Sequence, residues 1–435
     1  MEFGYDLNSI TFQYFRAFQI LKLEQVHMKH RLLIIAACLL ALLSTVGAAL
    51  PYPILPPLFA ADASNDLNHF LGLPPKLLFG VALSINPLGL LIGTALLGPM
   101  SDRYGRRPVL LASAIGAAIG HAITAWSLVI QNYPLFILAR FITGLLEGNA
   151  SVARAMLADK LEGDERVQAL AWLNGAVYSG WLVGPLIAGI TLQWGVTVPF
   201  WVATIALLMT AAMVAIALPK ERPSHLSTSW WQVAKSKHSF NLLKVPELKQ
   251  LFIIQLAYTS GVTAFYDFFP LWLVEVPGYH SKGIAWVTAA LCGVMALSSL
   301  AAGRPSTRPP LERIRFHAFC AAAAVAAVGL GNSWIGIAAI IAFGFPNAVY
   351  NAVLPSWCSE RFGHLGQGAV MGLISTTFYL ANILIALLGS LLTLIDTRII
   401  LIFGATLSIW AAWRIGHWHA ELVAKDNAEA AESAL

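Results

Sequence analysis

Charged side chains are scarce in this sequence. Asp, Glu, Lys and Arg make up 11% of its 435 residues, whereas ordinary soluble domains contain about 25%. Hydrophobic residues account for 58% of the chain. Because so few charges cannot cover the surface of a soluble fold, the composition excludes an ordinary soluble protein and indicates one embedded in a membrane.

Cysteine is scarce as well. The four cysteines, Cys38, Cys292, Cys320 and Cys358, have neither the spacing of a metal site nor that of a disulfide framework. We interpret them as small buried apolar residues. The loops contain no nucleotide-binding, nucleophile or metal-spaced motif, so we expect no enzyme activity, no metal and no cofactor.

The sequence contains several long runs without charged residues. Residues 32–61, 77–101, 108–139 and 167–219 contain no Asp, Glu, Lys or Arg, and each run is long enough for one or two membrane helices. We expect an all-α membrane protein with twelve spans. Their approximate ranges are 32–61, 77–100, 109–130, 135–157, two within 167–219, 251–274, 284–303, 314–330, 335–358, 367–391 and 399–413.

One long polar stretch, residues 220–249, divides these spans into two sets of six. The predicted organisation is an N-terminal cytosolic extension (1–31), a first bundle (32–219), a cytosolic linker (220–249), a second bundle (250–416) and a frayed cytosolic tail (417–435). Whether residues 1–27 belong to the functional protein stays open. An extension without a role is favoured over an interfacial helix.

The distribution of Lys and Arg predicts the orientation. With both termini in the cytosol, only Lys76, Lys282 and Arg398 of the 27 basic residues fall on the opposite side, and Arg140 lies inside a predicted span. We therefore attribute the net charge of +5 to cytosolic loops, not to a nucleic-acid site. Short loops favour the bacterial inner membrane.

The turn between the second and third spans holds one carboxylate among three arginines. Asp102 and Arg106 are spaced i,i+4, which predicts an ion pair. Gly98 and Gly105 allow close backbone approach and a tight reversal. The alternative is an ordinary positive-inside loop.

The pattern Gly98-x-x-x-Asp102-Arg103-x-Gly105-Arg106-Arg107 resembles the loop 2–3 signature of the major facilitator superfamily. The resemblance implies two six-helix bundles that work by alternating access. It also implies that these residues hold the cytosolic gate, with Asp102 facing the start of helix 11 near Gln367 and Gly368. A weaker echo, Gly303-x-x-x-Thr307-Arg308, has lost the carboxylate.

Charged residues also occur within the fourth predicted span. Arg140, Glu147 and Arg154 are seven residues apart, which places them near one face of a continuous helix. Each costs at least about 2.5 to 3.5 kcal/mol at membrane depth, so this face is expected to line a polar cavity. Glu147 is our candidate for a protonatable carboxylate, and a structural Arg–Glu–Arg ladder is the alternative. Arg154 and Asp159 are expected to join the gate.

Two further patterns resemble the proton-antiporter branch of the same superfamily. Arg140 and Gly144 are similar to its helix 4 signature, in which the arginine is implicated in proton coupling, although Thr143 stands where glutamine is frequent. The motif Gly180-x-x-x-Gly184-Pro185-x-x-Ala188-Gly189 resembles its helix 5 signature, with Ala188 replacing a glycine. Generic small-residue packing is the alternative.

Other residues are candidates for a substrate cavity. Asp267 in the seventh span is assigned either to substrate or proton binding or to the kink beside Pro270. Polar and aromatic residues that could orient an amphipathic organic ligand are Asn149, Asn174, Tyr178, Trp181, Asn347, Tyr350, Asn351, Tyr379 and Asn382. Each has an interhelical hydrogen bond as its alternative role, and we interpret His121 as a helix-packing residue.

Together these patterns favour a monomeric, proton-coupled exporter of a drug or small organic metabolite, similar to tetracycline-efflux proteins. Its expected partners are the substrate, protons and membrane lipid. A proton-coupled importer of a nutrient or siderophore-like chelate and a transport-inactive sensor remain alternatives. Substrate, direction and coupling ion stay open.

Overall fold

The computed structural model describes residues 28, 30–60, 63, 65–218, 239–302, 308–365 and 367–433. Most of them are helical, and nine of the described helices are long and apolar enough to cross a membrane. The prediction of an all-α membrane protein is confirmed. Most of the predicted N-terminal extension and linker, and the echo motif at Gly303 and Thr307, lie outside the described residues.

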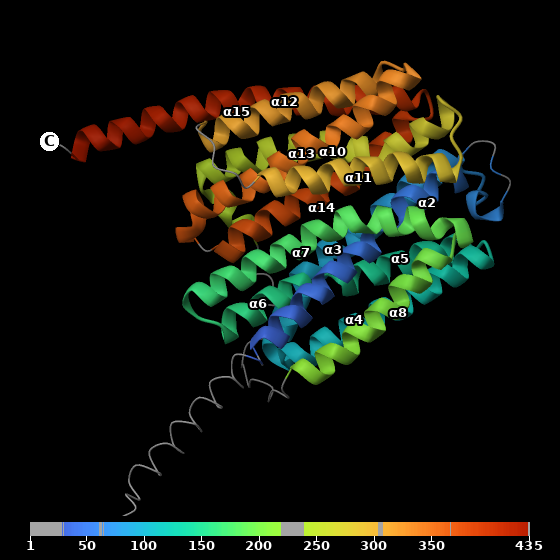
Figure 1. Ribbon diagram of the computed structural model, residues 1–435, viewed down its shortest axis with the longest axis horizontal. Coiled ribbons are helices and arrows are strands. Elements are labelled where there is room, and N and C mark those ends of the chain that lie inside the picture. The colour runs from blue at the N-terminus through green and yellow to red at the C-terminus, as the bar shows by residue number, and fades with distance from the viewer. Residues whose placement is uncertain are drawn as a thin grey trace, which may run out of the picture.

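The N-terminal helices occupy one half of the molecule (Figure 1). The first membrane span runs over His30–Leu58, and its last part is α2 (Pro51–Leu58). It is followed by α3 (Pro75–Tyr104), α4 (Arg106–Val129), α5 (Tyr133–Glu147), α6 (Ala150–Lys160), α7 (Gly163–Thr191) and α8 (Val198–Ala217). Since α3 carries Lys76 near its start and Asp102 near its end, we call the two ends of the molecule the Lys76 end and the Asp102 end.

The C-terminal helices form the other half (Figure 1). They are α10 (Pro246–Glu275), α11 (Ser281–Ala302), α12 (Pro310–Gly329), α13 (Ser333–Phe362), α14 (Gln367–Leu392) and α15 (Thr397–Ser433). The two halves meet where α3 packs on α14, α7 packs on α11, and α2 contacts both α10 and α11. Residues on α2, α10 and α14 therefore lie at the boundary between the halves.

The same helix–turn–helix occurs in both halves. After α4, Gln131 has a φ of 51° and the Asn132 side chain caps α5 by accepting a bond from the Leu135 amide at 2.9 Å. After α12, Gly331 has a φ of 82° and Asn332 caps α13 in the same way. A matching turn at matching places in the helix order is typical of repeated bundles.

The predicted fourth span is not one continuous helix. It breaks between α5 and α6, at Gly148 and Asn149. Gly148 is pressed against α3, since a Cβ there would lie 2.5 Å from the Thr94 amide nitrogen. The Asn149 amide donates to Ser44 Oγ on the first span at 3.0 Å. These contacts interrupt the face on which the sequence predicts Arg140, Glu147 and Arg154.

The prediction of a frayed tail from His417 is wrong up to Ser433, because α15 continues to that residue. Trp418 and Leu422 lie one turn apart and are 2% and 6% exposed, so they anchor the extension on the C-terminal half. Beyond them the chain is rich in Ala, which has the highest helix propensity, and also contains Lys425, Glu429 and Glu432.

Candidate functional site

An ionic cluster lies at the Asp102 end. Arg106 NH1 is 2.5 Å from Asp102 Oδ1, and Arg106 NH2 is 2.7 Å from Asp159 Oδ2 on α6. Arg106 also donates to Ser101 Oγ, and Arg107 donates to the Ala215 carbonyl on α8 at 2.8 Å. The cluster thus holds α3, α4, α6 and α8 together on this side of the N-terminal half.

The turn at Gly105 makes this cluster possible. Gly105 ends α3 and precedes α4 with a φ of 94°, a conformation that only glycine adopts without strain. The Asp102–Arg106 pair therefore forms across a sharp turn instead of along one helix. Gly98, the other glycine of the motif, faces open space, since a Cβ added there would meet no atom within 4 Å.

We expect Gly105→Ala to lower the free energy of unfolding by about 1 to 3 kcal/mol, because the substitution forces a Cβ into a strained backbone conformation. Gly98→Ala is the matched control and is expected to leave stability unchanged. Thermal unfolding of the two purified variants in detergent measures both effects. Equal losses at the two positions would contradict this account of the turn.

A buried acid–base pair lies inside the N-terminal half. Glu147 Oε1 on α5 is 2.7 Å from His121 Nε2 on α4, and both side chains are 0% exposed. The interpretation of His121 as a packing residue is therefore incomplete, because it binds the predicted protonatable carboxylate. Arg154, the last member of the alternative Arg–Glu–Arg ladder, donates to Asn174 Oδ1 on α7 at 3.0 Å.

Three neighbours complete the surroundings of the pair. The Asn86 amide on α3 lies 3.4 Å from Glu147 Oε2 and 3.2 Å from the Arg140 carbonyl. Arg140 is buried and its guanidinium donates to the carbonyls of Gly47 and Ala48 at 3.4 and 3.2 Å. Gly47 faces the pair so closely that a Cβ there would overlap both His121 Nε2 and Glu147 Oε1.

A second buried carboxylate lies at the boundary between the two halves. The Tyr52 hydroxyl on α2 donates to Asn382 Oδ1 on α14 at 3.0 Å, and the same hydroxyl lies beside the carboxylate of Asp267 on α10. Asp267 is 2% exposed, and its Oδ1 has no hydrogen-bond partner among the described residues. Trp181 packs between the rings of Tyr52 and Phe378, with centroid distances of 6.0 and 4.8 Å.

An ion pair joins the halves at the Lys76 end. Lys76 Nζ is 2.7 Å from Glu275 Oε1 and donates to the Thr393 carbonyl at 2.7 Å. Thr397 in turn donates to Glu275 Oε2 at 2.6 Å. These contacts, together with Tyr52–Asn382, hold the halves together on this side.

Other predicted cavity residues belong to a separate network in the C-terminal half. Asn347 accepts from Asn351 at 3.1 Å and donates to the Tyr266 hydroxyl at 3.1 Å. The Tyr350 hydroxyl donates to Gln255 Oε1 at 2.7 Å, and its ring stacks on Tyr258 at 3.6 Å. Asn347 and Tyr350 thus contact Tyr266 and Gln255, on the same helix as Asp267. Asn149 and Asn174 contact Ser44 and Arg154 in the other half.

Some predicted positions lie outside the residues whose side chains the structure describes. They are Tyr178 and the proposed partners of Asp102 near Gln367 and Gly368. Tyr379 is described and lies beside Phe378, with ring centroids 5.8 Å apart.

The helix 5 motif lies at two helix contacts. A Cβ at Gly180 would lie 2.5 Å from Thr45 Cβ, and one at Gly184 would lie 2.7 Å from Ala49 Cβ, both on the first span. Gly189 faces Ala285 on α11, in the other half. Pro185 lies inside α7 between these contacts, where it removes one backbone hydrogen bond.

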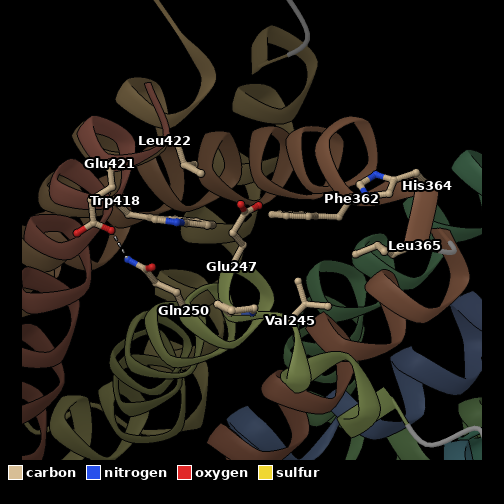
Figure 2. Close-up of a pocket in the computed structure, with 10 residues that line it drawn as sticks. Val245, Glu247, Gln250, Phe362, His364, Leu365, Trp418, Glu421 and Leu422 are labelled. Carbon is tan, nitrogen blue, oxygen red and sulfur yellow. Dashed lines mark hydrogen bonds between the residues drawn. The ribbon is translucent and has the colours of Figure 1, made fainter. Parts of the chain in front are cut away.

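A cavity of 480 Å³ opens where α10 begins and α13 ends. Figure 2 shows the Glu247 carboxylate between the rings of Trp418 and Phe362, with Gln250 bonded to Glu421 at one side. None of the residues predicted to line the substrate cavity contributes to it. The predicted site residues that the structure brings together lie instead in the buried clusters around Glu147 and Asp267.

Comparison with known proteins identifies the family. Residues 37–386 match the family described as the Major Facilitator Superfamily. The chain belongs to the major facilitator superfamily. It is therefore a multi-pass membrane transporter and not an enzyme, and its resemblance to that superfamily, predicted from the Gly98–Arg107 motif, is confirmed.

Individual members of the superfamily are more distant. The class B tetracycline resistance protein of Escherichia coli is 33% identical over 180 residues, which cover 41% of this chain and 42% of that protein. The multidrug resistance protein MdtG of Citrobacter koseri is 28% identical over 223 residues, 51% of this chain and 53% of that protein. The chain thus spans about half the length of these relatives or less.

Solved structures agree with the fold over nearly the whole chain. The human organic anion transporter MFSD10 (TETRAN) has a TM-score of 0.65 at 19% identity, covering 89% of this chain and 99% of that one. A D-xylose-proton symporter has a TM-score of 0.70 at 16% identity, covering 88% and 96%. At these identities the likeness concerns the major facilitator fold alone.

Sequence reasoning missed Gly47, Tyr52 and Asn86 in the buried clusters, and it assigned His121 to packing alone. A histidine inside the charge-free run 108–139 was a usable signal, because an ionisable residue at membrane depth needs a partner. Gly47 and Tyr52 carried no comparable signal, since glycine and tyrosine are common in membrane helices.

Proposed function

We propose that this transporter exports a small organic molecule in exchange for protons, by alternating access between its two helical halves. The Asp102 end faces the cytosol in this proposal, and the chain acts as a monomer in the bacterial inner membrane with both termini inside. Similarity to tetracycline resistance proteins and MdtG supports efflux. The helix 4 and helix 5 motifs support proton coupling.

The observation that carries this proposal is the pair of buried carboxylates. Glu147 lies inside the N-terminal half, and Asp267 lies where the halves meet. Removal from water disfavours the charged form of a carboxylate, so a conformation that buries the group and one that hydrates it differ in proton affinity, and proton binding shifts the balance between them. Two such groups on either side of a moving boundary supply a way to couple proton binding to rearrangement.

Arg140 links the two carboxylates. Its guanidinium lies near both the Glu147 carboxylate and the Tyr52 hydroxyl, and Tyr52 contacts Asn382 and Asp267 in the other half. A change of charge at either carboxylate therefore affects the Tyr52–Asn382 contact between the halves. Access of the substrate from the cytosolic side is then controlled by the gate residues Asp102, Arg103, Arg106 and Arg107.

The test is proton flux in liposomes that contain the purified protein and a pH-sensitive dye. We expect that tetracycline, lipophilic organic cations, siderophores or small metabolites, added in turn, cause substrate-dependent proton movement opposite to the substrate. Glu147→Gln and Asp267→Asn are expected to reduce this flux to background. Asp66→Asn, which alters an exposed carboxylate near the Lys76 end, is the control and is expected to retain it.

Other outcomes would replace the proposal. Proton movement in the same direction as the substrate would identify an importer. Substrate-dependent flux that is unchanged in both carboxylate variants would exclude the assigned coupling sites. Absence of flux with every probe, in protein that remains folded, would favour the transport-inactive sensor.

A further inference from the structure

We infer that His121 and Glu147 together form a single proton-binding site, and that the conformation described here is its proton-free form. This inference rests on the proposed proton coupling and assigns the coupling proton in the N-terminal half to two residues instead of one. His121 thereby acquires a defined role in binding and releasing that proton.

The His121–Glu147 pair is isolated from solvent. Both side chains are fully buried, and three other helices surround them. The first span contributes Gly47, α3 contributes the Asn86 amide, and α8 contributes the ring of Phe200, which stacks on His121 at 6.1 Å. The charged group that faces the pair is Arg140, on the same helix as Glu147.

The charges of Glu147 and Arg140 balance when the pair holds no extra proton. A deprotonated Glu147 beside a neutral His121 has a charge of −1, which Arg140 compensates. Both carboxylate oxygens accept hydrogen bonds in this form, Oε1 from His121 Nε2 and Oε2 from Asn86. The proton-free carboxylate is therefore the form that this arrangement satisfies best.

The described surroundings offer an added proton no position on the pair where its hydrogen bond would be satisfied. His121 Nδ1 is buried and has no hydrogen-bond partner among the described residues. If Nε2 donates to Glu147, the neutral ring leaves one acceptor, Nδ1, without a partner, which costs less than an unpaired N–H on a charged imidazolium. A proton added to the pair either creates an Nδ1–H without an acceptor or places an O–H where Glu147 now accepts, and burying an unsatisfied donor is unfavourable.

Loading of the pair consequently favours another arrangement of the surrounding helices. Arg140 loses its compensating negative charge when the pair gains a proton. Its guanidinium holds the carbonyls of Gly47 and Ala48, just before the first span is interrupted at Leu50 and Pro51. Movement of this segment carries Tyr52, which contacts the other half, so the site is positioned to drive the transition.

Two measurements test the inference. In transport assays, His121→Gln is expected to move the midpoint of the pH profile by about 1 to 3 pH units toward lower pH, because the proton then binds a carboxylate beside Arg140 without help from imidazole. His317→Gln is the matched control. His317 lies on α12 and hydrogen-bonds the Arg313 carbonyl at 2.7 Å, so its removal is expected to leave the midpoint unchanged.

Infrared difference spectroscopy of the isotope-labelled histidines needs no functional variant and no substrate. The chain has 11 histidines, so the contribution of His121 is the part of the imidazole band change that is absent in His121→Gln. Between the two ends of the pH profile, we expect this part to be lost in Glu147→Gln and kept in His317→Gln. An imidazole band change that is identical in the wild type and His121→Gln, or a His121→Gln transport profile that overlays the wild type, would overturn the inference. If transport fails with every probe while the band change persists, the proposed function falls and the proton site stands.

Discussion

Replacing Gly47 by alanine is expected to abolish proton-coupled transport. The added methyl group would overlap His121 Nε2 and Glu147 Oε1, which the wild-type structure holds 2.7 Å apart. Neither side chain can move into solvent, because both are fully buried. Overpacking of this kind costs about 1 to 3 kcal/mol, so we also expect a lower unfolding temperature.

A matched control separates this effect from a general intolerance of alanine in membrane helices. Gly175 lies on α7 with no atom within 4 Å of an added Cβ, so Gly175→Ala is expected to transport normally. Initial rates in liposomes, normalised to the amount of folded protein, measure both variants. Normal coupling in Gly47→Ala would show that the close contact with the buried pair is not required.

Asp102→Asn is the second change for which we expect a large effect. Among the described residues, both Asp102 and Asp159 form ion pairs with Arg106, and the Arg106 side chain is 13% exposed. When the charge of Asp102 is removed, the remaining carboxylate of this cluster, Asp159, lies on another helix and is 58% exposed. We expect turnover to fall to background while expression and folding remain intact.

Asp159→Asn is the control, because it removes the other described carboxylate that pairs with Arg106. An ion pair with so exposed a carboxylate contributes only about 0 to 1 kcal/mol, so this variant is expected to retain most of its transport. Parallel uptake assays and size-exclusion profiles of the two variants measure turnover and folding. Undiminished transport in Asp102→Asn would remove the residue from the gate.

The sequence by itself predicted the helical membrane architecture and the superfamily. Charge-free runs are local, and the energetic cost of charges in lipid makes each run a reliable sign of a span. The motif from Gly98 to Arg107 is equally local, so its turn and the Asp102–Arg106 pair followed from spacing. Predictions of helix ends were less accurate where packing decides, as at Trp418 and Leu422, which extend α15 beyond its apolar part.

Only the tertiary structure decided which buried polar groups meet. Glu147 stood out in the sequence, but its partner His121 lies 26 positions away on another helix. Whether two such residues touch depends on how each helix is rotated and how closely it approaches its neighbours. Here Gly120 on α4 lies directly against α5, since a Cβ there would overlap Thr143 Oγ1. Likewise, Tyr52 meets Asn382 across 330 positions because α2 lies at the boundary of the two halves. Hydropathy places residues in the membrane, whereas close packing between helices selects the partner of each buried charge.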